Sequence, residues 1–251
     1  VLGPTLIMLA ELFALLALAI AGGLWLASQP ELIGELSALA EKMATTPLSQ
    51  EELVELVQPY LLNPAVFLTA LLFIALVVPL IEELIKPIGV WFLLGRKLTP
   101  AAGFAAGAIS GAGYALFESL LLTMGGENWA AVVLARMGTT TIHMLTTALM
   151  GWALVGAWRK KKILRLVLVY AAAVLFHGLW NGVTLFTAFA TLAGMQSGSF
   201  QLDSVLRIGK FAPYLLGLFS VMAFVLILWA NRKLSGVKQP PGDPLLITPQ
   251  S

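Results

Sequence analysis

The feature that most constrains this chain is a succession of apolar segments, each long enough to cross a lipid bilayer as a helix. A bilayer core is about 30 Å thick, and about 20 helical residues span it. In the membrane every backbone polar group must be bonded internally, so these segments predict an all-α, polytopic bundle. We expect about six transmembrane helices, at residues 3–28, 63–94, 100–124, 129–158, 163–193 and 211–230.

The composition excludes an ordinary soluble domain. Hydrophobic residues make up 59% of the 251 positions and charged residues 11%, whereas soluble domains contain about 25% charged residues. The length fits one bundle, so we predict a single transmembrane domain over residues 1–251, in contact with the lipid bilayer and with no nucleic acid partner. The chain contains no cysteine, which excludes disulfide bonds, thiolate metal ligands and a cysteine nucleophile.

Two segments are expected outside the bilayer. Residues 29–62 carry many glutamates and one lysine, with apolar residues at helical spacing, which predicts an acidic amphipathic segment on the membrane surface, with a lid over a site as the alternative. Ser49 and Glu52 fit a capping box at the start of a short helix in this segment. The proline-rich residues 238–251 are predicted to be disordered. Because the chain begins at Val1 without an initiator methionine, we expect an N-terminal piece to have been trimmed or left out.

Basic residues predict the orientation in the membrane. Cytoplasmic loops of membrane proteins carry an excess of lysine and arginine, and this pattern predicts a multi-pass protein of the cell membrane with cytoplasmic N- and C-termini, a cytoplasmic tail and an extracytoplasmic segment 29–62. The basic residues fall at alternate helix ends: Arg96 and Lys97, then Arg159 to Lys162 with Arg165, then Arg232, Lys233 and Lys238.

The second apolar segment is too long for one straight crossing. Residues 63–94 would extend about 48 Å as a helix, beyond the ~30 Å core. Pro79 and Pro87 each lack a backbone donor, which leaves the carbonyls of Ala75 and Glu83 without their usual helical partners. We therefore predict a kinked second helix.

Three charged residues, Glu82, Glu83 and Lys86, lie between these two prolines. A charged side chain at the bilayer centre costs at least ~2.5 to 3.5 kcal/mol, so this cluster needs partners, water or a function. Other spans supply further polar residues that we expect to share an aqueous cavity with the cluster: Glu118, Arg136, His143, His177 and Asn181.

Two other features concern packing. Glu11 in the first span is expected near an interface or hydrogen-bonded between helices, with a contribution to the polar site as the alternative. Gly103, Gly107 and Gly111 recur at four-residue intervals, which predicts a close-packing helix face.

Several hydrolytic chemistries are excluded by the residues. An aspartyl intramembrane protease needs two membrane-embedded aspartates, but Asp203 and Asp243 both lie outside the spans. The His-Glu-x-x-His pattern of zinc proteases is absent. Ser110 lacks the Gly-x-Ser-Gly setting of a rhomboid-like nucleophile and is interpreted as a packing residue. Glutamate and histidine chemistry remains.

The ordered polar motifs resemble those of a known family. Glu82-Glu83-x-x-Lys86, Tyr114-x-x-x-Glu118, His143 and His177-x-x-x-Asn181 are similar to the motifs of the PrsW family of glutamic-type intramembrane proteases, within the wider CPBP (Abi) group that includes the CAAX prenyl proteases. The resemblance covers about residues 64–185. It departs from the family at Tyr114, where phenylalanine is usual, and at Asn181, where some members have aspartate, which disfavours a metal-ligand role there. It implies an intramembrane endopeptidase that cuts a membrane-protein substrate, anti-sigma-factor-like or another single-span protein, toward the extracytoplasmic side.

Peptide hydrolysis requires a base, oxyanion donors and an acid, and the residues allow a division of these roles. We expect Glu82 to be the base, with Glu118 or His143 holding the attacking water. His177 and Asn181, one helical turn apart, suit the oxyanion hole.

Three neighbouring residues are expected to support this catalytic set. Lys86 neutralises and orients a carboxylate, Glu83 is more structural than catalytic, and Tyr114 accompanies Glu118.

Two alternatives remain open at the level of sequence. We expect no cofactor, but a zinc ion could be held by the same residues, with its bound water as the nucleophile. The ligands would then be Glu82, Glu118, His143 and His177. A proton- or cation-coupled transporter also uses kinked helices and buried charges, although no inverted repeat is recognisable.

Overall fold

The computed structural model describes residues 2–121, 129–194 and 209–236, and within these ranges the chain is helical and contains no strand. The predicted disordered tail, residues 238–251, lies outside the described residues. In chain order the helices are α1 (Leu2–Leu26), α2 (Pro30–Thr45), α3 (Gln50–Leu61), α4 (Pro64–Leu72), the π-helical turn η1 (Phe73–Val77), α5 (Val78–Ile85), α6 (Ile88–Trp91), α7 (Pro100–Leu121), α8 (Trp129–Lys160), α9 (Ile163–Gly194) and α11 (Ala212–Ser235).

Helices of membrane-spanning length and hydropathy confirm the all-α polytopic class. Among the described residues five qualify, namely Leu2–Leu26, Pro64–Trp91, Ala135–Lys160, Ile163–Leu192 and Ala212–Ser235. The third expected span, α7, is 22 residues long and is not among them. Its crossing of the bilayer therefore stays a prediction.

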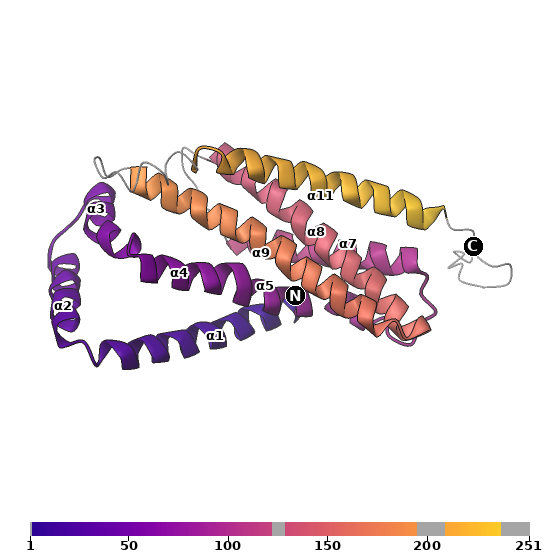
Figure 1. Ribbon diagram of the computed structural model, residues 1–251, viewed down its shortest axis with the longest axis horizontal. Helices are drawn as coiled ribbons and strands as arrows, with labels where there is room; N and C mark the ends of the chain where they lie inside the picture. The colour runs from indigo at the N-terminus through magenta and orange to yellow at the C-terminus, as the bar shows by residue number, and fades with distance from the viewer. Residues whose placement is uncertain (1, 122–128, 195–208, 237–251) are drawn as a thin grey trace.

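Helix α8 is the centre of the bundle, with α7, α9 and α11 packed around it (Figure 1). Glycines allow α7 and α8 to approach closely, as predicted. A Cβ atom on Gly107 would collide with the carbonyl oxygen of Thr147 and come within 2.9 Å of Ala148 Cα. Against the opposite side of α8 an apolar core forms around Ile142, Leu145 and Trp180.

The second span is interrupted at both prolines, as predicted. Pro79 stands in the first turn of α5, directly after η1, and α5 ends at Ile85 before Pro87. In η1 the Val78 N–H bonds to the carbonyl of Phe73, one residue further back than in an α-helix. The carbonyl of Ile74 is then left without a donor, because the residue five positions later is Pro79, which has no N–H.

Helix α1 starts beside α5 and runs toward one end of the molecule, where α2 and α3 lie before the chain returns as α4 (Figure 1). The predicted capping box opens α3: the Ser49 hydroxyl accepts the Glu52 N–H at 3.2 Å, and the Glu52 carboxylate accepts the Ser49 N–H at 2.8 Å. Because this backbone N–H stabilises the charged form, the pKa of Glu52 is held below its ordinary value. Gln58 joins α3 to the end of α9 by donating to Leu192 O at 2.6 Å.

The basic helix ends gather at the opposite end of the molecule from α2 and α3. The turn between α8 and α9 lies there, as does the end of α11 (Figure 1). Arg159 donates to Leu98 O at 3.0 Å, which joins the end of α8 to the segment before α7. The charge separation along the bundle supports the expected topology, and the orientation itself remains a prediction.

Candidate active site

The ammonium group of Lys86 is the centre of the charged cluster. Its Nζ lies 2.6 Å from Glu82 Oε2 and 2.9 Å from Glu83 Oε1, and the Lys86 side chain has no exposed surface. The segment between Pro79 and Pro87 therefore places three charged side chains in the interior of the bundle. Both carboxylates have a cation partner where bulk water is absent, which is the condition for keeping buried charges.

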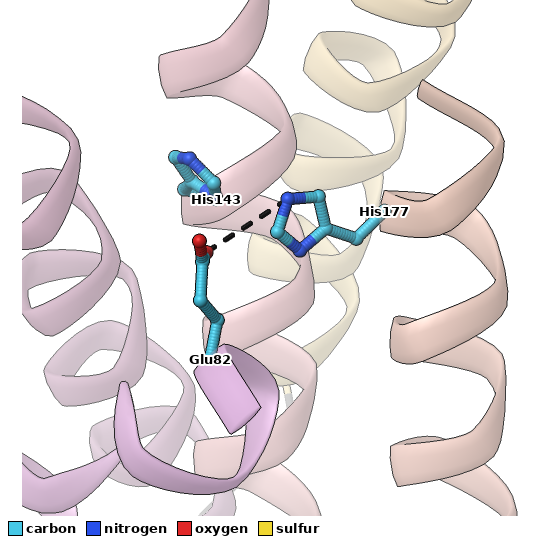
Figure 2. Close-up of side chains that lie close together, drawn as sticks. All are labelled: Glu82, His143 and His177. Carbon is cyan, nitrogen blue, oxygen red and sulfur yellow. Dashed lines mark ion pairs between the residues drawn. The ribbon is translucent and has the colours of Figure 1, made fainter. Parts of the chain in front are cut away.

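His177, from α9, completes this cluster on one side. Its Nδ1 lies 2.9 Å from Glu83 Oε1 and 3.4 Å from Lys86 Nζ. A carboxylate can only accept and an ammonium can only donate, so the shorter contact indicates that the Nδ1–H donates to Glu83. The Nε2 atom then carries a lone pair, and it lies 3.8 Å from Glu82 Oε2 (Figure 2).

His143, from α8, completes the cluster on the other side. Its Nδ1 is 2.6 Å from Lys86 Nζ, so this nitrogen accepts from the ammonium. The opposite nitrogen, Nε2, donates to Glu118 Oε2 at 3.0 Å, and that oxygen also pairs with Arg136 at 2.7 Å. A continuous line of polar contacts thus joins α5 to α7 and α8, and both nitrogens of His143 are engaged.

Tyr114 closes the cluster from α7. Its ring is buried, with Lys86 Nζ 4.8 Å from the centroid, and it meets the His143 ring edge to face at 5.2 Å. The aromatic face therefore covers the ammonium. One turn earlier, Ser110 donates to the Lys86 carbonyl at 2.6 Å, so the serine ties α7 to the end of α5. That contact agrees with the packing role expected for Ser110.

Asn181 satisfies the backbone at the interruption of the second span. Its Nδ2 donates to Ile74 O at 3.0 Å, the carbonyl left without a helical donor by η1 and Pro79. Gly178, one turn before, lets α9 approach the same turn, because a Cβ there would collide with Ala75 O. One amide hydrogen of Asn181 is engaged in this bond and the second is available.

The polar site opens on a cavity of about 490 Å³ between α1, α5, α7 and α9. Its polar lining consists of Glu11, Glu82, Glu118, His177 and Asn181, with Thr184 further along α9. A second cavity, of about 440 Å³ and mainly apolar, lies on the other side of Tyr114 and Phe117, which line both. Glu82 and His177 therefore face this cavity, whereas Glu83 does not line it.

All the residues singled out from the sequence for this site come together here. Glu82, His143 and His177 converge from three separate helices (Figure 2), and Glu83, Lys86, Tyr114, Glu118, Asn181 and Arg136 surround them. Glu11 was expected near an interface or between helices, yet it lines the cavity beside Glu82. The sequence feature that pointed to this placement is that Glu11 is the one charged residue in the first predicted span, residues 3–28.

The contacts also test whether a metal ion fits. Glu82, His143 and His177 offer ligand atoms that all lie within 4.8 Å of one another, and two histidines with one glutamate form a known catalytic zinc set. Zinc would need these atoms at about 2.0 to 2.2 Å. The Lys86 ammonium, however, stands 2.6 Å from both Glu82 and His143. This cation occupies the same donors and would repel a divalent ion, so a metal could bind these three residues only if the ammonium moved away.

A helical membrane protein with glutamates, histidines and an open cavity at one buried site fits the class of polytopic membrane enzymes. Comparison with family models narrows this class: residues 14–229 match the PrsW family, described as PrsW family intramembrane metalloprotease. The chain therefore belongs to the PrsW family and is an intramembrane peptidase. It is located in a membrane, and its substrates are membrane proteins in a lipid environment. Comparisons with curated proteins and with solved structures gave no match.

Proposed function

We propose that the protein hydrolyses a peptide bond in a single-span membrane protein by means of a water molecule activated by Glu82. The observation that carries this proposal is the pair formed by Glu82 Oε2 and His177 Nε2, 3.8 Å apart, on side chains that both line the cavity. One water molecule can bridge two acceptors at that separation. Glu82 takes a proton from this water, and the water oxygen attacks the scissile carbonyl.

The contacts support a division of roles that differs in part from the one expected from sequence. Glu118 and both nitrogens of His143 are engaged with Arg136 and Lys86, which favours His177 over them as the second residue that holds the water. The free amide hydrogen of Asn181 suits the developing oxyanion. Glu118 and His143 then act as positioning residues.

Lys86 and Glu83 support the reaction without touching the substrate. Lys86 neutralises two carboxylates, and Glu83 fixes the ring orientation and tautomer of His177 through its 2.9 Å contact with Nδ1. Carboxylates that orient a functional histidine in this way are common in metal and hydrolase sites. Tyr114 covers the ammonium and separates it from the cavity.

A zinc-dependent reaction is the second candidate, favoured by the family description and by the proximity of Glu82, His143 and His177. Against it stands the ammonium of Lys86, which occupies the donors that zinc would need. We therefore propose the metal-independent, glutamic type. The wider grouping with the CAAX prenyl proteases rests on the order of the motifs alone and is proposed on that ground.

The test is a cleavage assay with purified protein in liposomes and a set of synthetic single-span peptides, with products mapped by mass spectrometry. Wild-type protein is expected to cut at least one peptide, and Glu82→Gln to lose at least about 10²-fold in rate, because the amide keeps the shape of the side chain but cannot accept a proton. Glu31→Gln, the same chemical change on exposed α2, is the matched control and should behave as wild type.

Elemental analysis of the same preparation separates the two candidates. The glutamic proposal expects activity that survives chelation. About one zinc per chain, with activity lost to a chelator and restored by zinc, would replace it with the metal mechanism. Wild-type turnover by a folded Glu82→Gln variant would remove the proposed base.

A further inference from the structure

Glu11 is a half-buried carboxyl group that the reaction described above does not use. It projects from α1 into the cavity that also exposes Glu82, and the two carboxyl groups lie within hydrogen-bonding reach of each other. Among the described residues, Glu11 Oε1 is buried and lacks a hydrogen-bond donor, whereas Glu82 Oε2 has the Lys86 ammonium 2.6 Å away. A single proton held between these two carboxyl groups would satisfy the Glu11 oxygen, since an ionised carboxylate can only accept.

The cations around the site are paired with carboxylates other than Glu11, so the Glu11 carboxyl group can carry that proton. Lys86 is paired with Glu82 and Glu83, and Arg136 is paired with Glu118. No described cation forms an ion pair with Glu11. Two carboxyl groups in contact at one site cannot both ionise at low cost, which is why paired carboxyl groups in proteases share a proton.

We infer that Glu11 is a further catalytic residue, the acid that protonates the leaving amine, and this inference rests on the proposed function. In the attack step one proton of the water passes to Glu82 and the water oxygen bonds to the carbonyl carbon. In the breakdown step the carbon–nitrogen bond breaks and Glu11 gives its proton to the nitrogen. The proton on Glu82 then passes to Glu11 across their contact, and both groups return to their first state.

The other polar groups at the site are less suited to this task. Both nitrogens of His143 and the Glu118 carboxylate are engaged with charged partners, and Lys86 lies behind Tyr114. Glu11 is therefore the acid that both faces the cavity and touches the base. It lies before residue 14, where the family match begins, so the family comparison does not cover it.

The experiment compares two versions of one peptide substrate. Once the scissile bond of a synthetic peptide is mapped, the same peptide is made with the scissile nitrogen replaced by sulfur. A thiolate with a pKa of about 8.5 leaves without being protonated, whereas an amine does not. Glu11→Gln is expected to lower kcat on the amide by about 10²-fold or more, as for loss of a general acid. On the thioester it should stay within about threefold of wild type, with KM little changed on both.

Control variants separate the acid role from a structural one. Glu82→Gln should lose both substrates, and Glu31→Gln neither. Glu11→Asp keeps an acid and should cut the amide faster than Glu11→Gln does; if the glutamine variant does not fold, Glu11→Asp and Glu11→Asn are compared in the same way. Equal loss of Glu11→Gln on both substrates, or amide cleavage near the wild-type rate, would overturn this inference alone. A wild-type protein that cleaves neither substrate would overturn the proposed function and this inference with it.

Discussion

Lys86 shows how single residues make a charged site possible inside a membrane. Its ammonium group serves two carboxylates and one histidine nitrogen within 2.9 Å. Each of these groups would be costly to bury alone. The stability of the site therefore depends on this one cation more than on either glutamate.

Replacing Lys86 by methionine is expected to destabilise the protein by about 3 to 5 kcal/mol, because the change leaves buried carboxylates without a counter-ion. The free energy of unfolding is measured by denaturant titration in detergent micelles. The double variant Lys86→Met with Glu83→Gln removes one of the two stranded charges and should recover part of the loss. A single variant as stable as wild type would show that the carboxylates are not held as ions by Lys86.

The sequence was enough to list the residues of the candidate site but not to predict which of them contact one another. Charged residues in apolar spans are costly, so Glu82, Lys86 and Glu118 could be assigned to one interior cavity. Their partners depend on how helices far apart in the chain are rotated against each other. Glu11 illustrates this limit, because nothing in the local sequence distinguishes a carboxyl group at an interface from one that faces the base.

At the scale of elements, the contact between α7 and α8 accounts for much of the helix packing in the bundle. Gly103, Gly107 and Gly111 bring the two backbones together, and this contact places Tyr114 and Glu118 opposite His143. Small residues at four-residue spacing predict such a contact directly. The packing of helices thus sets the distances at the site.

Gly107→Ala is expected to cost about 1 to 3 kcal/mol of stability, because the added methyl group meets backbone atoms of Thr147 and Ala148 rather than a side chain that can move. Thermal unfolding in detergent measures the effect. The control is Gly22→Ala on α1, where nothing lies within 4 Å of the new atom and alanine favours the helix. Equal effects of the two substitutions would contradict a tight α7–α8 contact.

The kinks of the second span could be predicted only in part from the sequence. Both prolines predicted an interruption, and the helices end or begin beside them. From the sequence we expected the carbonyl of Ala75 to lack a helical donor, but the Asn181 side chain donates to the carbonyl of Ile74. The π-helical hydrogen bonding of η1 shifts the pattern by one residue, and such a turn depends on the contact with α9 as well as on the local sequence.

At the scale of the whole molecule, the acidic helices α2 and α3 lie at one end and the basic α8–α9 turn at the other (Figure 1). Glu118 lies three residues before the end of α7, on the side away from Pro100. With the expected topology, the cavity is reached from the extracytoplasmic half of the membrane. The substrate would then be cut toward that side.

Because the chain contains no cysteine, single cysteines can report this orientation. Gly34→Cys on exposed α2 should react with a membrane-impermeant maleimide added outside intact cells, and Lys162→Cys in the α8–α9 turn should react only after the cells are opened. The reverse labelling pattern would invert the topology. The predicted side of the cut would then move to the cytoplasmic face.

The π-helical turn Phe73–Val77 also has a consequence for how chains of this family should be aligned. A π turn holds one residue more than the regular helix would, while the helix on either side keeps its direction. A related chain that lacks one residue here would form an unbroken α-helix with the same faces before and after it. A one-residue deletion between Glu82 and Lys86 would instead rotate all later residues by about 100°. A one-residue gap within the turn therefore changes the structure little. From Pro79 onward, the number of residues must stay the same, because a deletion there would rotate the later side chains away from the site.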